Sequence, residues 1–574
     1  MEYKWMIREK ADLKTVESLS KEINVNPTLA NMLVNRGVDT FQKAKDFFRP
    51  DLDKLHDPLL MKDMDKAVIR LASAIENEEK ILVYGDYDVD GTTSVAMMYG
   101  YLSRFYPHLD FYIPDRYKEG YGISEKGVRF AAENNFKLII SLDCGIKAIS
   151  KVALAKELGV DFIICDHHTP GEELPPAVAI LDPKRQDCQY PYKELSGCGV
   201  GFKLIQAISQ HRGEDSSIVM SYLDLLAISI AADIVPITGE NRILTFYGIE
   251  RINNNPRPGI KALILRSKIE KDIEISDIVF KIGPRINASG RLEHAKASVE
   301  LLISKDLEDA LARAELVDTV NAARKNFDEN ITKEAISMIE SMEEVRQYKS
   351  TVLFKEDWHK GVIGIVASRC IERYYRPTII LTESNNKATG SARSVFDFDI
   401  YEAISECSEL LEQFGGHKYA AGLTMAVDKV PAFQEKFEEV VSSRIHDIHL
   451  KPVMEIDDEI LLDQINYKFY NILKQMAPFG PGNPEPIFTV KQVYAENVRV
   501  LKDKHLRFNV VQDGQETKPV CIAFGMADKN AFPDEFVYKM LLRKMRFDLA
   551  FEIRENTFRN NSSLQLYVKD IKFD

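Results

Sequence analysis

The sequence predicts an α/β protein: two α/β lobes, the first built on a parallel sheet, are joined by a long helical connector and followed by a small C-terminal β-barrel. Three observations predict this arrangement. Strand-like and helix-like segments alternate over residues 61–245 and again over 348–448. A charged helical pattern separates the two regions, and short alternating strands fill residues 452–574. A chain of 574 residues is also too long for a single hydrophobic core.

The first two regions carry clear local signals. Residues 1–60 predict a helical lead-in, because Asn26-Pro27 offers an N-cap followed by proline at the first helical position. The first lobe contains three apolar runs that each end on an aspartate, namely ILVYGDYDVDG (81–91), KLIISLDCG (137–145) and DFIICDHH (161–168). Short runs rich in Ile, Leu and Val are typical of buried parallel strands.

The later regions continue the alternation and then change character. Residues 246–347 are mixed at first and then become a long charged helix, which we expect to connect the lobes. In the second lobe TVLFKED, TIILTE and ATGSARSV predict strands, whereas GVIGIVASRCIERYY and DIYEAISECSELLEQFGG predict helices. The alternating runs that follow, such as HLRFNVVQ and DLAFEIREN, predict about five antiparallel strands in a barrel of the OB kind.

Composition excludes several classes of protein. No segment reaches the roughly 20 apolar residues of a membrane helix, and the charged N-terminus MEYKWMIREKADLK lacks the apolar core of a signal peptide. The seven cysteines form no CxxC pair, and Cys144 and Cys165 lie at predicted buried strands. We therefore expect a cytoplasmic protein without membrane contact. The net charge of −13 argues against nucleic-acid binding, although an acidic protein can carry a local basic groove.

The three aspartate-ended strands predict a crowded acidic crevice, because ligands in open α/β sheets bind at the carboxyl ends of the strands. Alternation along an extended DYDVDG would place its three aspartates on one face, and we expect the next helix to start near Thr92–Ser94 after a turn at Gly91. Asp143 alone could be a helix N-cap, and Asp233 a helix-terminal carboxylate without a role. The candidate crevice residues are Asp86, Asp88, Asp90, Asp143, Asp166, His167 and His168, with Asp233 as a further member.

So many carboxylates need a counter-charge, and a divalent metal pair supplies one. An EF-hand interpretation fails because the twelfth position from Asp86 is Met97 rather than glutamate. Carboxylates with histidine favour Mn²⁺ or Mg²⁺, and two such ions about 3.5–4 Å apart suit phosphodiester hydrolysis. The sequence contains neither a GxxxxGK[ST] loop nor an HExxH motif, so a P-loop NTPase and a zincin protease are not indicated.

Motifs along nearly the whole chain resemble the DHH phosphoesterase superfamily, and within it the bacterial single-strand-specific 5′→3′ exonucleases that carry DHH, DHHA1 and OB domains. The resemblance implies a DHH domain at 61–245, a DHHA1 domain at 348–448 and an OB domain at 452–574. The motifs that carry it are VYGDYDVDGTTS, IPDRYKEGYG (113–122), SLDCGI, DHH, LSGCGVGFKL (195–204), AADIVPITGENR, GPRINASGRLEHA (283–295), WHKGVIGIVASR (358–369), GSARS (390–394), FGGHKYAAGL (414–423) and FGPGNPEP (479–486).

The resemblance also implies roles for individual residues. The implied metal set is Asp86, Asp88, Asp90, Asp143, His167 and Asp233. His168 would face the scissile phosphate, and Asp166 would lie close to the metals, so that His168, Asp143 and Asp166 form the implied catalytic group. One position departs from the pattern: many relatives have histidine two residues before the first motif aspartate, where this chain has Tyr84. A phenol is a poor ligand at neutral pH because its pKa is about 10.

Substrate contacts are implied in both lobes. Arg116 matches a position that contacts the terminal 5′-phosphate, and Ser391 and Arg393 match phosphate contacts in the DHHA1 domain. The further candidates are Arg285, Asn287, Arg291, His359, Gly416 and His417. Each arginine could instead sit in a surface salt bridge, and His417 could be a helix-end cation. Barrel aromatics such as Phe508 and Phe524 could stack on bases or fill the barrel core.

These implications predict a monomeric exonuclease that degrades single-stranded DNA, preferably 5′-phosphorylated, to mononucleotides in repair and recombination. A single-strand-binding protein and a RecQ-type helicase are the expected partners. Two alternatives stay open. One is a nanoRNase or cyclic-dinucleotide phosphodiesterase with DHH and DHHA1 domains, although such relatives typically lack an OB domain. The other is a non-catalytic DNA-binding scaffold with a DHH fold, which a nearly complete ligand set disfavours.

Overall fold

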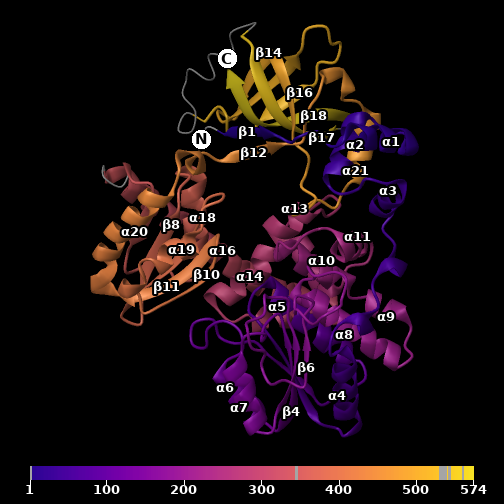
Figure 1. Cartoon of the computed structure of the whole chain (residues 1–574), viewed down its shortest axis with the longest axis vertical. Helices are drawn as coiled ribbons and strands as arrows, with labels where there is room; N and C mark the ends of the chain where they lie inside the picture. The colour runs from indigo at the N-terminus through magenta and orange to yellow at the C-terminus, as the bar shows by residue number, and fades with distance from the viewer. Residues whose placement is uncertain (1–2, 343–346, 529–539, 541–544, 559–560, 574) are drawn as a thin grey trace.

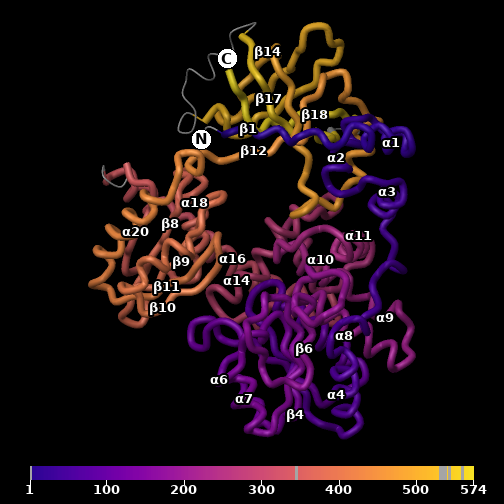
Figure 2. Tube along the Cα trace, viewed as in Figure 1, coloured from indigo at the N-terminus to yellow at the C-terminus, as the bar shows by residue number. Residues whose placement is uncertain are grey.

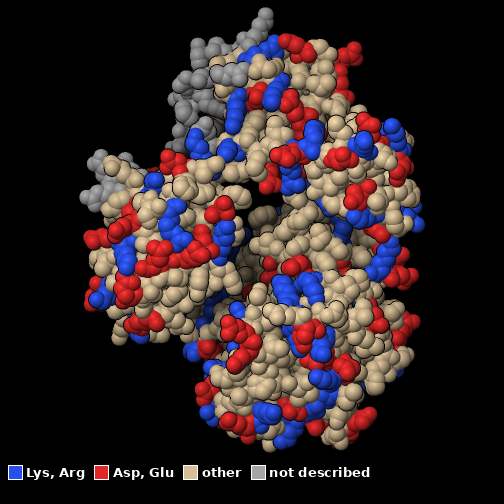
Figure 3. All heavy atoms as spheres, in the orientation of Figure 1, with Lys and Arg blue, Asp and Glu red and all other residues tan. Residues whose placement is uncertain are grey.

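The computed structural model describes residues 3–342, 347–528, 540, 545–558 and 561–573. The chain forms two α/β lobes and a C-terminal barrel (Figure 1), and the space-filling view shows an opening bounded by all three parts (Figure 3). This architecture confirms the predicted fold class. None of the helices in the described part of the chain is long and apolar enough to cross a membrane.

The first lobe is built on a five-stranded parallel sheet with the order β3-β2-β4-β5-β6. Alternate residues of each strand enter different cores, so that Ile81 and Val83 face one side of the sheet while Leu82 and Tyr84 face the other. The strands are β2 Lys80–Gly85, β3 Leu109–Tyr112, β4 Phe136–Leu142, β5 Asp161–Cys165 and β6 Ala179–Leu181. Both faces are covered, as is usual for parallel sheets.

Helices pack on both faces of this sheet (Figure 1). The face with Ile81 packs against α4 Met64–Glu76, α5 Val89–Leu102 and α8 Gly197–His211. The face with Leu82 packs against α6 Glu125–Glu133 and α7 Ile149–Glu157. The lobe continues through α9 Ser216–Met220, α10 Leu223–Ala232, α11 Gly239–Asn254, α12 Pro258–Arg266, α13 Ile275–Asp277, a π-helix at Ile278–Ile282, α14 Gly283–Leu292 and α15 Lys296–Leu302.

Two predictions for this lobe are wrong in detail. Helix α5 begins at Val89 rather than near Thr92, because Asp88 is its N-cap and accepts a hydrogen bond from the Gly91 amide at 2.9 Å. DYDVDG is therefore a strand end, a cap and a first helical turn, not an extended run. The stretch 246–295, expected to be mixed, is mainly helical, with non-helical segments at 255–257, 267–274 and 293–295.

The connector is helix α16, Leu307–Ser341, which leads into the second lobe and confirms the predicted long helix. The second sheet has the order β10-β11-β9-β8-β7, with β7 Thr351–Phe354, β8 Thr378–Ser384, β9 Lys387–Arg393, β10 Gln413–His417 and β11 Ala420–Ala426. Its helices are α18 Ile363–Arg373, α19 Ile400–Ser405 and α20 Val430–Arg444. The helix predicted over DIYEAISECSELLEQFGG ends early, because residues 413–417 pair with β11 as an edge strand.

The C-terminal barrel confirms the five predicted strands and closes through pairing of β14 with β17. The strands are β14 Phe488–Leu501, β15 His505–Val511, β16 Val520–Ala523, β17 Phe547–Phe558 and β18 Asn561–Phe573, with the short β13 Asp458–Glu459 beside β14. Helix α21, Tyr467–Gln475, precedes β14. The segment between α21 and β14 returns to the first lobe, as described below.

The N-terminal region belongs partly to this barrel. The lead-in is not purely helical, since β1 Lys4–Ile7 pairs in parallel with β12 Val453–Ile456. Helices α1 Leu13–Ile23, α2 Pro27–Asn35 and α3 Phe41–Phe48 follow, and apolar residues of all three share one core with the barrel strands. Figure 2 shows the chain then running from α3 past the first lobe to α4. The N-terminal residues and the C-terminal barrel therefore form one packed unit, although they lie at opposite ends of the sequence.

Candidate metal centre and substrate cleft

The register of the first sheet aligns the ends of four strands. Gly85 pairs with Leu142, Leu142 with Cys165, and Cys165 with Leu181. The next residue along each strand is an aspartate: Asp86, Asp143, Asp166 and Asp182. All four are buried, so a row of carboxylates lines the carboxyl edge of the sheet.

Two further aspartates, Asp88 and Asp90, come from the start of helix α5, which follows β2. Asp88 is the N-cap. Asp90 lies in the first turn and accepts hydrogen bonds from the amides of Gly197 and Cys198, at 2.6 and 2.9 Å, and from Ser229 Oγ at 2.6 Å. Those two amides begin helix α8, whose positive end favours a carboxylate. A Cβ at Gly91 would clash with the backbone of Asp86, so Gly91 permits close packing rather than a turn.

Histidine and a helix-end carboxylate complete the acidic pocket. Asp233 is the C-cap of α10. His167 Nε2 lies 3.2 Å from Asp143 Oδ1, 3.6 Å from Asp233 Oδ2 and 3.9 Å from Asp90 Oδ2. Donor atoms lie within 4.8 Å of one another in each of two groups, Asp90–His167–Asp233 and Asp143–His167–His168. Neither group includes Asp86 or Asp88.

The electrostatics of the pocket call for a cation. Burial, followed by the charges of Asp90 and Asp88, raises the pKa of Asp143 well above its usual range and that of Asp233 to about 9. Burial also raises the pKa of Asp86 and lowers the pKa of His167. Buried polar atoms without hydrogen-bond partners of good geometry include both oxygens of Asp86, both ring nitrogens of His167 and Oδ2 of Asp233.

Unpaired buried oxygens and a neutral imidazole are the donors that Mn²⁺ and Mg²⁺ sites use. The residues present therefore fit a divalent metal site, on chemistry as well as on position.

His168 is held on two sides. Its Nδ1 lies 2.7 Å from Asp166 Oδ1, and its Nε2 lies 3.0 Å from the hydroxyl of Tyr121. Burial alone would lower the pKa of His168, but the hydrogen bond and charge of Asp166 raise it to about 9. Asp166 also accepts the backbone amides of His167 and Ile146, at 2.7 and 2.9 Å. Asp166 thus orients the two histidines and holds a protonated His168.

Tyr84 turns away from the acidic pocket. Its hydroxyl donates to the Gly122 carbonyl oxygen at 3.1 Å and accepts from the Ser124 amide at 3.1 Å. Its ring stacks on Tyr112 inside the core, and burial raises the pKa of the phenol. Tyr84 is therefore a core residue and not a metal ligand.

A group of arginines lies at the junction of the two lobes. Burial, followed by the positive charges of Arg116, Arg324 and Arg393, lowers the pKa of Arg291 to about 10. Arg393 Nη1 donates to Ser391 Oγ at 3.1 Å and to the Ala392 carbonyl oxygen at 2.8 Å, and makes no ion pair in the described part of the chain. Guanidinium groups that converge with unused donors are typical of anion-binding sites.

Backbone features add to this cationic site. Gly364, at the start of α18, leaves no room for a Cβ because Ser391 Oγ and Arg393 Nη2 would lie only 2.9 and 3.0 Å from it. Arg291 Nη1 donates to the Gly361 carbonyl oxygen at 3.1 Å, which joins the lobes directly. The start of α18 therefore packs closely against Ser391 and Arg393, and helix N-termini are common anion-binding positions.

The other predicted substrate residues lie on several elements of the two lobes. Arg285 forms a salt bridge with Asp318 at 2.8 Å, so the structure supports the alternative of a salt bridge for Arg285. Asn287 Oδ1 is buried without a partner. His359 accepts from the Gly361 amide at 3.0 Å, and burial lowers its pKa. Gly416 and His417 lie on the edge strand β10, so the helix-end alternative for His417 is wrong.

Gly416 has a φ of 152°, and a Cβ there would meet the Ala420 carbonyl oxygen. Among the barrel aromatics, Phe508 is fully buried and fills the core, whereas Phe524 is 57% exposed beside His505 and Tyr567. Of these two residues, base stacking therefore stays open for Phe524.

Sequence reasoning missed three residues near the acidic pocket. Tyr121 lies within the motif IPDRYKEGYG but was not singled out. Asp182 ends the apolar run AVAILD just as the other aspartates end theirs, a signal that could have found it; burial raises its pKa to about 7. Lys184 follows two residues later. Burial and the charge of Asp90 raise the pKa of Asp233, and the positive charge of Lys184 acts in the opposite direction.

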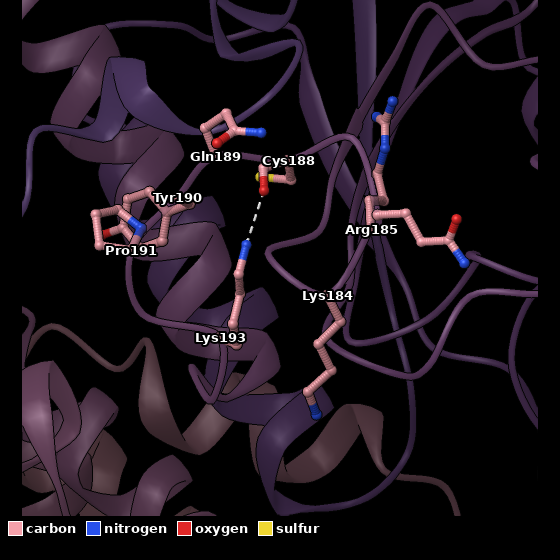
Figure 4. A pocket seen from close by; sticks show the side chains of 8 residues that line it. Lys184, Arg185, Cys188, Gln189, Tyr190, Pro191 and Lys193 are labelled. Carbon is pink, nitrogen blue, oxygen red and sulfur yellow. Dashed lines mark hydrogen bonds between the residues drawn. The ribbon is translucent and has the colours of Figure 1, made fainter.

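Lys184 lines a hollow of about 590 Å³ together with Arg185, Tyr190 and Lys193. Figure 4 shows these side chains and the hydrogen bond from the Lys193 ammonium group to the Cys188 carbonyl oxygen.

Comparison with known protein families gives three matches in order along the chain. They are the DHH family N-terminal domain over residues 80–230, the DHHA1 domain over 347–443 and the RecJ OB domain over 456–570. Fold, acidic pocket and these matches define the class of protein: a DHH phosphoesterase that carries DHHA1 and OB domains.

Individual relatives narrow the class. The single-stranded-DNA-specific exonuclease RecJ of Bacillus subtilis is 36% identical over 99% of this chain and 70% of the relative. That of Escherichia coli is 32% identical over 95% of this chain and 96% of the relative. The chain belongs to the RecJ family. The crystal structure of Thermus thermophilus RecJ in complex with Mn²⁺ superposes with a TM-score of 0.85, at 26% identity, over 100% of this chain and 80% of that one.

Proposed function

We propose that the protein is a metal-dependent exonuclease that hydrolyses single-stranded DNA from its 5′ end to mononucleotides. One observation carries the proposal: a buried acidic pocket with unpaired donors lies beside a group of arginines with unused donors. The acidic pocket and the arginines interact electrostatically. Burial and the charge of Asp88 raise the pKa of Asp86, and the positive charge of Arg116 acts in the opposite direction. A terminal phosphate bound by the arginines would place the next phosphodiester at the acidic pocket.

The pocket divides the work of hydrolysis among its residues. Asp88, Asp90, Asp143, His167 and Asp233, with Asp86 close by, would hold the metal pair. Bound there, Mn²⁺ or Mg²⁺ would supply an activated water and stabilise the leaving oxygen.

The residues around the pocket would position the reacting groups. Asp90 is fixed by the start of α8, so it keeps one orientation. Asp166 holds His168 protonated near neutral pH, and the imidazolium would face the negative charge that grows on the scissile phosphate. The Tyr121 hydroxyl sets the direction of the His168 ring.

The polarity of cleavage follows from the cationic site. Ser391, Arg393 and the first amides of α18 come from the second lobe, whereas Arg116 comes from the first. A 5′-phosphate bridging them is a monoester with more charge than an internal phosphodiester, so these groups favour a strand end. Cleavage one nucleotide from that end releases a 5′-mononucleotide.

The test is product analysis on single-stranded DNA labelled at either end, with Mn²⁺ or Mg²⁺ supplied. We expect mononucleotides from the 5′ label at the earliest times and little cleavage of blunt duplex. Mononucleotides released first from the 3′ label would overturn the polarity. Faster cleavage of cyclic dinucleotides or very short RNA would favour the phosphodiesterase alternative, and no cleavage of any substrate with either metal would favour a scaffold.

The proposal includes the setting in which the enzyme acts. We expect a monomer, since one chain supplies both the acidic pocket and the cationic site, and light scattering after gel filtration tests this. All seven cysteines are buried and free, which suits the cytoplasm. A RecQ-type helicase and a single-strand-binding protein would supply single strands during repair and recombination, and pull-down with each purified partner tests the contact.

A further inference from the structure

The motif FGPGNPEP lies between α21 and β14, and the acidic pocket does not account for it. In the structure this part of the chain leaves the barrel and packs on the loop that follows Asp233. We define the clasp as residues 476–483 and the Asp233 loop as residues 234–238. The Ile237 amide donates to the Pro481 carbonyl oxygen at 2.7 Å. A Cβ on Gly480 would lie 2.6 Å from Ile237 Cγ1, and one on Gly482 would lie 2.9 Å from Thr238 Cγ2.

Two buried side chains hold the clasp in shape. Asn483 Nδ2 donates to the carbonyl oxygens of Met476 and Pro478, both at 2.9 Å. Arg242 of α11 donates to the carbonyl oxygens of Met476, Ala477 and Pro478 at 3.0–3.3 Å, and to that of Phe47 at 2.9 Å. The acceptors lie at the C-terminal ends of α21 and α3, where helix dipoles favour a cation. The clasp is therefore fixed to the first lobe.

The Asp233 loop contains a strained residue. Ile234 has a φ of 59°, a left-handed conformation that is a genuine outlier for a β-branched side chain. Its side chain is 69% exposed, so buried packing does not offset the strain. Val235 precedes proline and favours an extended conformation, and Pro236 has a fixed φ. Ile234 is thus where the chain turns from helix α10 into a loop whose far end the clasp holds.

We propose that the clasp is a positioning device for Asp233. By holding the Asp233 loop through Ile237 and Thr238, it keeps Ile234 left-handed, and that turn aims the adjacent Asp233 toward His167, 3.6 Å away. Strained conformations persist only where the surroundings over-determine them. The clasp shares this task with Tyr192 and Asn241 of the first lobe, which donate to the Pro236 carbonyl oxygen at 3.2 and 3.0 Å, and it alone holds the Ile237 amide. The inference rests on the proposed function, because it treats Asp233 as a metal ligand. The clasp, which connects α21 to the first barrel strand β14, would thus help to shape the metal centre.

The test compares Asn483→Ala, Ile234→Gly and the double variant in the full chain. Glycine adopts a left-handed φ without strain, so nothing drives position 234 to relax when the clasp loosens. We expect Asn483→Ala to weaken Mn²⁺ binding about tenfold in calorimetry and to speed amide exchange in the Asp233 loop without metal. We expect the double variant to bind Mn²⁺ within about threefold of Ile234→Gly. The matched control is Asn509→Ala, which removes an amide that bonds Lys518 on the barrel, and it should change neither measurement.

Two outcomes would overturn the inference: unchanged Mn²⁺ binding and exchange in Asn483→Ala, or an equal tenfold loss in both backgrounds, which would indicate general loosening. If Asn483→Ala does not fold, Gly482→Ala replaces it in both comparisons, because a Cβ at position 482 would lie 2.9 Å from Thr238 Cγ2 and disturb the contact of the clasp with the Asp233 loop. Neither measurement requires DNA. If Asn483→Ala weakens Mn²⁺ binding only when residue 234 is isoleucine, but the wild-type protein never cuts DNA, the proposed function alone is refuted. If the wild-type protein cuts DNA and the effect of Asn483→Ala does not depend on residue 234, the inference alone is refuted.

Discussion

Replacing Asp143 by asparagine should abolish cleavage and yet stabilise the metal-free protein. Asp143 is 2% exposed, and its charge is opposed by burial and by the charges of Asp90, Asp88, Asp233 and Asp166. Asparagine has the same shape without the charge. It also suits the left-handed φ of 60° at this position, and it can hydrogen-bond His167 Nε2, which lies 3.2 Å from Asp143 Oδ1.

The magnitude follows from proton linkage. An ordinary aspartate has a pKa of about 3.9, and each pH unit is worth about 1.4 kcal/mol, so the ceiling at pH 7 is about 4 kcal/mol. The pocket shares its protons among several carboxylates, which reduces the effect, and we expect about 2 kcal/mol. Because burial raises the pKa of Asp143, the folded protein keeps a proton that the unfolded chain releases. The contribution of Asp143 to wild-type stability therefore falls as pH rises above about 4, and the advantage of Asp143→Asn should grow from pH 5 to pH 7.

Calorimetric unfolding in EDTA at both pH values measures the difference. At pH 7 the variant should unfold about 4–8 °C higher if the first lobe unfolds as one unit. Added Mn²⁺ should reverse the order, since wild type at 100 times its Kd gains about 2.7 kcal/mol. A variant that is no more stable than wild type in EDTA at pH 7, or whose advantage shrinks as pH rises, would refute this account of the pocket.

Three further predictions test other parts of the structure. Arg393→Ala should remove the preference for 5′-phosphorylated over 5′-hydroxyl strands, raising KM about tenfold for the former only; equal losses on both ends would indicate general binding. Tyr84→Phe should cost about 1 kcal/mol of unfolding free energy and leave the Kd for Mn²⁺ unchanged, because its hydroxyl bonds Gly122 and Ser124. Phe524→Ala should weaken binding of long strands by about 1–3 kcal/mol and leave dinucleotide cleavage intact; equal affinity would exclude stacking there.

Strand ends were the most predictable part of the site. Asp86, Asp143 and Asp166 follow buried parallel strands, and topology alone brings such positions to one edge of a sheet. Asp182 obeys the same rule, since it ends the apolar run AVAILD, although only three residues of that run form the strand. The DYDVDG conformation was mispredicted because Asp88 could cap a helix or continue a strand, and packing against α8 decides between them.

Side-chain partners between distant segments could not be predicted. Whether Arg285 binds substrate or Asp318 depends on how α14 packs against α16, and no local signal contains that information. The strand Lys4–Ile7 exists because β12 pairs with it from the other end of the chain. Arg242 would pass in the sequence for a surface residue of an amphipathic helix, yet it is 5% exposed and bonds only carbonyl oxygens.

The clasp changes how the role of the barrel can be tested. Deleting the chain from residue 452 removes the strand-binding candidate Phe524 and also the contact between Pro481 and Ile237. If strain at Ile234 positions Asp233, such a deletion slows cleavage even of dinucleotides that never reach the barrel. Lost activity in the truncated protein is then no measure of DNA affinity. Phe524→Ala and Asn483→Ala, each in the full chain, separate the two contributions, because one alters only an exposed barrel face and the other only the approach to the metal centre.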